Sequence, residues 1–423
     1  MTRLKLFDRR WIRPPGNQTT EAPGRRNGQT FQVIVNTDAR TKSDAALVLT
    51  GGGARAAYQV GVLRALAHIL PHGAPNPFPI VCGTSAGAIN AAAIAAGATD
   101  FHRAARRLQL VWRNFRANQV YRTDPIRLAA TGVRWLLEPV LRRFGMSKPV
   151  SLLDNTPLRE LLKARLDLHE IGDVVSAGKL RALAITASSY DSGESITFYQ
   201  GNDLLSGWRR ARRVGMRVEI GVEHLLASSA LPFIFPPTRI HREYFGDGSM
   251  RQMSPLSPSL HLGAQRLFVI SVGREISEEP ERVKVDTYPS LAQIAGHALN
   301  SIFLDGLESD IERLERINRT LRLIPAESRD PDVFQLREVD VMVMHPSQDL
   351  GALAAQYART LPLAVRFLLG AIGGMRRDGG TLVSYLLFEQ DYCRALIDLG
   401  YKDTMMRREE VERFLGPQNP GTS

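Results

Sequence analysis

The sequence predicts an α/β protein with a largely parallel sheet that is covered by helices on both faces. Short apolar runs rich in β-branched residues alternate with longer segments of helical periodicity along most of the chain. Strands separated by helices form parallel sheets, because the crossover helices pack on the two faces. The 423 residues suffice for one large α/β domain with an appendage, or for two domains.

Composition divides the chain into four parts. Residues 1–43 are polar and rich in Arg, Pro, Gly, Asn and Thr, so we expect a disordered basic arm that holds at most a short strand at FQVIV. Residues 44–349 carry the alternating strands and helices and form the expected α/β domain. Residues 350–416 have helical periodicity only, and residues 417–423 form an expected disordered tail.

Each element follows from a local pattern. The first helix, residues 54–70, has apolar residues at helical spacing and stops at Pro71, and the second is the alanine-rich segment that ends at Gly97. The expected strands are short buried runs at residues 45–50, 78–83, 180–189, 194–200, 239–246, 266–273 and 339–345.

The charge and cysteine content limit the partners and the compartment. A net charge of +11 attracts nucleic acid, an anionic membrane surface or acidic substrates, without choosing among them. Cys82 and Cys393 lie far apart, which excludes a disulfide scaffold and fits a reducing, cytoplasmic compartment. The amino-terminal segment lacks the apolar core of a secretory signal.

No segment predicts a transmembrane helix. Such a helix needs about 18 or more consecutive apolar residues. The nearest candidate, LPLAVRFLLGAIGG at residues 361–374, is too short and contains Arg366. We therefore expect a buried or interfacial helix there.

The pattern G-x-S-x-G at residues 83–87 is the first candidate for chemistry. It lies where the second expected strand meets the second helix, so the Ser85 hydroxyl would stand on a sharp turn at the carboxyl edge of the sheet. Gly83 and Gly87 would be required because a Cβ there would collide with the turned backbone. So short a pattern also arises by chance, and the alternative is a small-residue helix packed closely on the sheet.

Three consecutive glycines, Gly51, Gly52 and Gly53, separate the first strand from the first helix. Their amide N–H groups can converge on one oxygen if no side chain intervenes, so the loop is a candidate oxyanion hole for Ser85. Arg55 would add positive charge or brace the loop. A purely structural glycine turn is the alternative.

Two nucleotide-binding interpretations of these glycines lack essential residues. A dinucleotide fingerprint requires an acidic residue about 20 positions later, and none occurs between Asp44 and Asp100. A P-loop requires Gly-Lys-Ser/Thr, and no lysine occurs between Lys42 and Lys148.

The general base is the harder assignment. His261 and His297 are candidates by chain order, although neither lies in a glycine-marked loop after a late strand. Asp247 stands between two glycines after a strand-like segment, and burial beside a serine hydroxyl would raise its basicity. The alternative for Gly-Asp-Gly is a tight turn.

Taken together, these segments resemble the patatin-like phospholipase family. The resemblance rests on GGGARA at 51–56, GTSAG at 83–87, ASSALPFIFPP at 227–237 and DGS at 247–249, and it covers roughly residues 44–275. It implies a three-layer α/β/α fold and hydrolysis of lipid acyl esters, so residues 44–349 would be the catalytic domain. A phospholipid or another acyl ester would be the substrate, with no cofactor and no metal.

The resemblance also implies roles for individual residues. Ser85 would be the nucleophile and Asp247 the base of a Ser–Asp dyad without histidine. The oxyanion loop would contain Gly51, Gly52, Gly53 and Arg55. Two positions depart from the family pattern, since Ala56 stands in place of glycine and Ser249 in place of glycine or alanine.

A membrane contact and two other functions remain as hypotheses. Residues 101–116 have an apolar face bordered by arginines, which suits either an anionic membrane surface or the protein core. The basic run at 208–217 predicts a solvated face or a loop. A non-catalytic lipid- or partner-binding protein is the alternative function, and nucleic-acid binding is not expected because it rests on charge alone.

Overall fold

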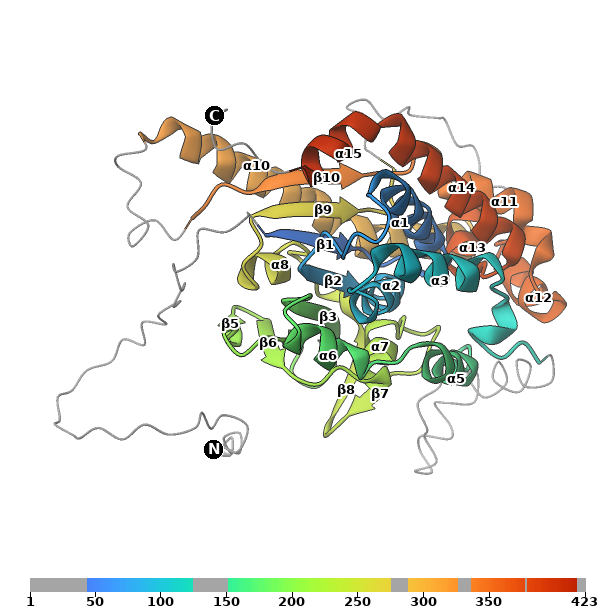
Figure 1. Ribbon diagram of the computed structural model, residues 1–423. Helices are drawn as coiled ribbons and strands as arrows, with labels where there is room; N and C mark the ends of the chain where they lie inside the picture. Colours follow the sequence, from blue (N-terminus) through green and yellow to red (C-terminus); the bar gives the residue numbers. More distant parts are fainter. Residues whose placement is uncertain (1–43, 125–150, 275–287, 326–335, 377–378, 417–423) are drawn as a thin grey trace, which may run out of the picture. The chain divides into compact units, whose positions relative to one another are not determined.

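The computed structural model describes residues 44–124, 151–274, 288–325, 336–376 and 379–416 (Figure 1). The predicted arm at 1–43, with its short strand, and the predicted tail at 417–423 lie outside the described residues.

One mixed sheet organises the described residues. Ten strands form it, in the order β10-β9-β1-β2-β3-β4-β6-β5, while β8 pairs with β3 and β7 pairs with β8. The half from β10 to β3 is entirely parallel. The strands are β1 (Ala45–Leu49), β2 (Ile80–Thr84), β3 (Ala182–Ser189), β4 (Ser195–Gly201), β5 (Trp208–Arg210), β6 (Arg213–Arg217), β7 (Thr238–Ile240), β8 (Glu243–Asp247), β9 (Arg266–Ile270) and β10 (Asp340–Met344).

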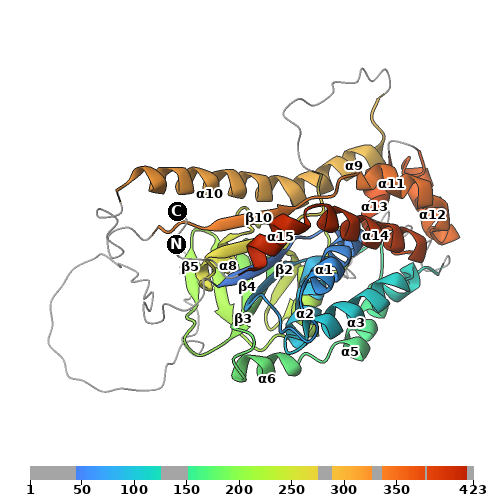
Figure 2. The same ribbon diagram turned by 45° about the horizontal axis from the view of Figure 1, so that its top comes forward.

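Helices cover both faces of the sheet, which confirms the predicted three-layer α/β/α fold (Figures 1 and 2). Alternate residues of each strand point to opposite faces, so Leu47 and Leu49 join one core cluster and Ala46 and Val48 join another. The first cluster includes residues of α1 (Ala57–Ile69), α2 (Ala86–Ala96), α3 (Phe101–Arg113), α14 (Gln390–Met406) and α15 (Arg408–Leu415). The second includes residues of α10 (Gly306–Leu323) and the segment around α8 (Ser257–His261).

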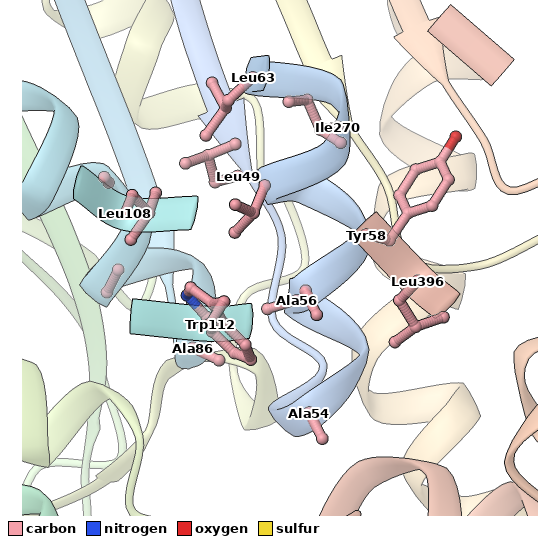
Figure 3. Packing of buried hydrophobic residues seen from close by; sticks show 14 of the residues in the cluster. Leu49, Ala54, Ala56, Tyr58, Leu63, Ala86, Leu108, Trp112, Ile270 and Leu396 are labelled. Atoms are coloured by element: carbon pink, nitrogen blue, oxygen red, sulfur yellow. The ribbon is translucent and has the colours of Figure 1, made fainter. Parts of the chain in front are cut away.

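The helical segment after residue 350 shares the larger core with the α/β part. Tyr58 of α1 and Leu396 of α14 are both fully buried there, and Leu49 and Trp112 close the core toward β1 and α3 (Figure 3). Residues on both sides of the predicted boundary at residue 350 therefore contribute to one core cluster. The remaining helices are α5 (Thr156–Arg165), α6 (Glu170–Ser176), α7 (Val222–Ser228), α9 (Leu291–Asn300), α11 (Leu350–Tyr357), α12 (Leu363–Ala371) and α13 (Gly380–Leu386).

Strands occur in all seven expected segments, but the segment at 239–246 forms two antiparallel strands, β7 and β8, instead of one. The structure also adds one hairpin where a solvated face or loop was expected. Residues 208–217 form the antiparallel pair β5–β6 at the edge of the sheet. Trp208 stacks on the Tyr199 ring and Val214 is buried, while most of the arginines point to solvent. Charged side chains on a short edge strand hinder further strand pairing, which explains the basic sequence.

Two further expectations concern membranes. None of the described helices combines the length and the apolar character that a membrane span requires. Residues 361–374, the nearest candidate in the sequence, form the short helix α12 and the turn after it.

Candidate active site

Ser85 stands at the sharp turn between β2 and α2, where the sequence placed it. Its backbone has φ 56° and ψ −131°, a left-handed conformation that is strained for any residue with a side chain. The Ser85 amide N–H donates to the Ser228 hydroxyl over 2.8 Å, and the side chain is only 2% exposed. A strained serine on a sharp strand-to-helix turn is characteristic of the nucleophile elbow, in which the turn directs the hydroxyl away from the backbone.

The two flanking glycines allow this turn to approach its neighbours. A Cβ at Gly87 would lie 2.4 Å from the carbonyl oxygens of both Leu49 and Thr50 on the adjoining strand. A Cβ at Gly83 would lie 2.5 Å from the Gly87 carbonyl oxygen. Both contacts are shorter than side chains tolerate, so any larger residue would displace the turn from the end of β1.

Sheet register brings Asp247 beside Ser85. β3 is the shared neighbour, because Thr84 of β2 pairs with Thr186 and Asp247 of β8 pairs with Ala187. Asp247 is completely buried, and its Oδ1 accepts a hydrogen bond of 2.9 Å from the Ser249 amide. Ser85 and Asp247 are 162 positions apart in the chain. They lie together because Thr84 and Asp247 pair with the adjacent residues Thr186 and Ala187 of β3.

Burial raises the pKa of Asp247 to about 6, against opposition from hydrogen bonds of Ser85 and Ser249, which favour the ionised form. The Ser85 hydroxyl is therefore close to the carboxyl group. Oδ2 nevertheless has no partner that satisfies strict hydrogen-bond geometry among the described residues. The Ser85 and Asp247 side chains are therefore neighbours without an aligned hydrogen bond at Oδ2.

The three glycines of the loop differ in what they face. Gly53 has φ 54°, and a Cβ there would lie 2.2 Å from the Tyr385 carbonyl oxygen. Gly53 lines the same cavity as Ser85, whereas Gly51 packs near Phe303 and Gly52 near Val272. Within the described residues, the amide groups of all three glycines donate no hydrogen bond.

Arg55 is buried and directed away from the cavity, toward the carboxyl-terminal helices. Its Nε donates to Ser384 Oγ over 2.7 Å, and Nη1 donates to Asn300 Oδ1 and to the Tyr385 hydroxyl. The guanidinium also lies 4.1 Å from the centroid of the Tyr385 ring. Of the two roles that the sequence suggested, these contacts favour the brace over a direct oxyanion contact.

A cavity of about 450 Å³ extends from Ser85 along α2. Its lining includes Ser85 and Ala86 at the start of the helix and Ala96 and Gly97 at its end. The 11 residues of α2 span about 16 Å, so the cavity is long as well as apolar. Apolar side chains from other elements complete its walls, among them Leu108, Trp112, Phe115, Leu162, Leu231 and Phe388.

Charged residues gather where α3, α5 and α6 border the cavity. Arg103, Arg107 and Arg165 line it together with Asp167 and Glu170. The apolar face of α3 is buried, and its arginines at 103, 106 and 107 are exposed. This is the core-facing arrangement considered for residues 101–116, so the apolar side of α3 is not available to a membrane.

Neither candidate histidine belongs to the site. The His261 Nδ1 lies 2.8 Å from the Ser257 carbonyl oxygen, and its ring stacks on Trp208. His297 is exposed on α9. All nine histidines are described and none lines the cavity that holds Ser85, so the arrangement favours Asp247 over a histidine as the titratable neighbour of Ser85.

Sequence reasoning missed the supporting role of residues 228–230. The Ser228 hydroxyl donates to the Thr186 carbonyl oxygen over 2.6 Å while it accepts from the Ser85 amide. The Ala230 carbonyl oxygen accepts from the Asp247 amide over 2.9 Å. This segment therefore fixes both members of the pair, and only its resemblance at 227–237 gave a signal for it.

The two departures from the family pattern fit their surroundings. Ala56 is buried in helical conformation at the start of α1, and its carbonyl oxygen accepts from the Asn90 side chain. Ser249 binds Asp247 through its amide. In the part of the chain that the structure describes, no group of three or more His, Cys, Asp or Glu side chains could hold a metal ion.

The chain is similar to a curated phospholipase. A cGAMP-activated phospholipase of Pseudomonas aeruginosa is 28% identical over 215 residues. The match covers 51% of this chain and 55% of the relative, so it spans only about half of that protein's length.

Two solved structures have low overall similarity. VipD from Legionella pneumophila matches with a TM-score of 0.35 and 14% identity, over 84% of this chain and 67% of VipD. Human GIVD cytosolic phospholipase A2, in complex with methyl gamma-linolenyl fluorophosphonate, matches with a TM-score of 0.37 and 12% identity, over 88% and 59%.

The family comparison covers the site itself. The model of the patatin-like phospholipase family matches residues 47–260, about half of the chain. This range includes the glycine loop, the Ser85 turn and Asp247 in the order in which the sequence presents them. The chain belongs to the patatin-like phospholipase family.

Proposed function

We propose that this protein hydrolyses an acyl ester bond of a lipid, with Ser85 as nucleophile and Asp247 as general base. One observation carries the proposal: the strained Ser85 lies between the fully buried carboxyl group of Asp247 and a long apolar cavity. The proposed classification is a carboxylic-ester hydrolase that forms an acyl-enzyme. Family membership supports the same activity.

In the first half-reaction, the carbonyl carbon of the ester approaches Ser85 from the cavity. Asp247 accepts the Ser85 proton as Oγ bonds to that carbon, and the carbonyl oxygen becomes an oxyanion. The unpaired amide of Gly53 and the amino end of α2 stabilise its charge. The ester C–O bond then breaks, and Asp247 returns the proton to the leaving alcohol.

In the second half-reaction, water replaces the alcohol. Asp247 takes one proton from water while the water oxygen bonds to the acyl carbon. The bond between the acyl carbon and Ser85 Oγ then breaks. Oγ recovers the proton from Asp247, and a carboxylic acid leaves. Every proton moves between Asp247, Ser85 and the reactants, so this mechanism needs neither a metal nor a cofactor.

The cavity favours an ester with a long acyl chain. Its walls along α2 are apolar for about 16 Å, and the transfer of methylene groups from water into such a site is favourable by about 0.8 kcal/mol each. The proposed substrate is a phospholipid or another acyl ester. The border of the cavity is mixed in charge, because its three arginines, Arg103, Arg107 and Arg165, are accompanied by four carboxylates, those of Asp100, Asp167, Glu170 and Asp173.

A labelling experiment with an active-site probe tests the proposal. A fluorophosphonate should label the wild-type chain and fail to label Ser85→Ala. Hydrolysis of long-chain esters should fall at least about a thousandfold in Ser85→Ala and in Asp247→Asn. Ser259→Ala removes a buried serine of α8 that does not line the cavity, and it is the matched control.

The outcomes separate the alternatives. Persistent labelling of Ser85→Ala would remove the assignment of the nucleophile. Full activity of Asp247→Asn would remove the dyad. A folded wild-type chain without labelling or hydrolysis would support a non-catalytic lipid- or partner-binding protein. Because the relative is named as cGAMP-activated, each assay is run with and without cGAMP.

A further inference from the structure

The surface formed by α9 and α12 exposes large apolar side chains on one end of the molecule. Leu363 and Phe367 of α12 are 78% and 83% exposed, and their spacing of four residues puts them on one side of the helix. Leu291 and Ile294 of α9 are 66% and 48% exposed. We use the name α9–α12 surface for these four residues together with Arg359, Arg366 and Arg376.

The start of α9 lies against the turn that follows α12. The Ala292 amide at the start of α9 donates to the Ile372 carbonyl oxygen after the end of α12, over 3.0 Å. Figure 2 shows α9 and α12 together with α11 and α13 at one end of the structure. Single exposed apolar residues are ordinary on protein surfaces, whereas two such pairs on neighbouring helices suit a contact surface.

The charge of this surface has one sign. Arg359, Arg366 and Arg376 lie on or beside α12, and none of the three pairs with a carboxylate among the described residues. The sequence has no Asp or Glu at residues 350–376 or at 288–304. An apolar helix face with arginines at its border suits an anionic lipid surface.

Charge also disfavours a second copy of the chain as the occupant. In a two-fold dimer the same patch faces itself, so arginines would oppose arginines with no carboxylate between them. Anionic headgroups would supply the missing counter-charges, while acyl chains would receive Leu363 and Phe367. We propose that the α9–α12 surface docks this protein on anionic lipid bilayers, an inference that takes its purpose from the proposed action on lipids.

Vesicle binding by the full chain provides the test. Wild-type protein should sediment with phosphatidylcholine vesicles that contain phosphatidylserine, more weakly with phosphatidylcholine alone, and more weakly at high salt. Phe367→Glu and Leu363→Glu should each lower partitioning at least about tenfold, because a large apolar side chain no longer enters the bilayer. Leu204→Glu, which changes a side chain that is 81% exposed elsewhere, should bind within about twofold of wild type.

A second measurement distinguishes docking from catalysis. Hydrolysis of a water-soluble short-chain ester should be unchanged in Phe367→Glu, since α12 contributes no residue to the cavity of Ser85. Hydrolysis of lipid in anionic vesicles should fall with the partitioning. If no variant hydrolyses any ester while Phe367→Glu still loses vesicle binding, docking stands and the proposed function fails.

Three results would overturn the docking proposal. The first is vesicle binding by Phe367→Glu equal to that of wild type. The second is an equal loss in Leu204→Glu, which would show a general effect of added negative charge. The third is light scattering, without lipid, that finds the wild type to be a dimer and Phe367→Glu to be a monomer.

Discussion

Replacing Asp247 by asparagine should make the protein more stable at neutral pH while it removes activity. Burial raises the pKa of Asp247 from its usual 3.8 to about 6. Because the folded value exceeds the unfolded one, folding favours the neutral acid. The resulting stabilisation is complete below pH 3.8 and is lost as the pH rises through about 6.

The magnitude follows from the size of the shift. About two pKa units, at about 1.4 kcal/mol per unit, give about 3 kcal/mol of stability that the ionised wild type lacks above neutral pH. The substituted asparagine cannot ionise, and its side-chain oxygen can still accept from the Ser249 amide. The stability of Asp247→Asn relative to wild type should therefore rise by about 3 kcal/mol between acidic and neutral conditions.

Urea unfolding of both proteins from about pH 4 to about pH 8, followed by circular dichroism, measures this difference. Any effect of the substitution that does not vary with pH shifts the difference in unfolding free energy equally at every pH. It therefore drops out when the differences at two pH values are compared. Asp203→Asn controls for removing a carboxylate from the surface. A difference that changes by less than about 1 kcal/mol over this range would refute the reasoning, since it would mean that folding does not perturb the Asp247 carboxyl.

Three further outcomes are expected. Hydrolysis by wild type should fall about tenfold per pH unit below about pH 6, as a pH–rate profile would show, because protonated Asp247 cannot accept the Ser85 proton. Ala93→Phe should lower kcat/KM for long-chain esters at least about tenfold and leave kcat/KM for short-chain esters unchanged, because Ala93 lines the cavity midway along α2. A series of esters of increasing chain length measures this, and Ala164→Phe, on the exposed side of α5, is the control. Gly53→Ala should lower both kcat and the melting temperature, by roughly 2 kcal/mol or more in stability, because φ is 54° and the Tyr385 carbonyl would obstruct the new methyl group.

Local sequence patterns predicted most of the sheet. The strand around residues 45–50 and the turn at Ser85 are encoded by short-range features, namely buried apolar runs and glycines at a strand end. The edge hairpin β5–β6 was missed because arginines dominate its sequence, while Trp208 and Val214 pack into different core clusters on opposite faces of the pair. With so few apolar residues on either face, the strand pattern in the sequence is weak.

Long-range contacts limited how much of the candidate site could be predicted from the sequence. The sequence suggested that Ser85 and Asp247 meet, but the register through Thr186 and Ala187 that places them together depends on the whole sheet. The direction of Arg55 was likewise undetermined, because its partners lie about 245 and 330 residues away. Periodicity and spacing describe an element and its neighbours, and they contain no information about such distant partners.

The sheet order has a consequence for how the chain can be shortened. β1, which leads into the glycine loop, lies between β2 and β9, and β9 begins only at Arg266. A fragment that stopped at the family boundary, residue 260, would leave one side of β1 with open hydrogen-bonding groups and deprive Arg55 of Asn300 and Ser384. Such a fragment would carry every residue of the proposed chemistry and should still aggregate, so we expect a stable fragment to need β9 and the helices that hold Arg55.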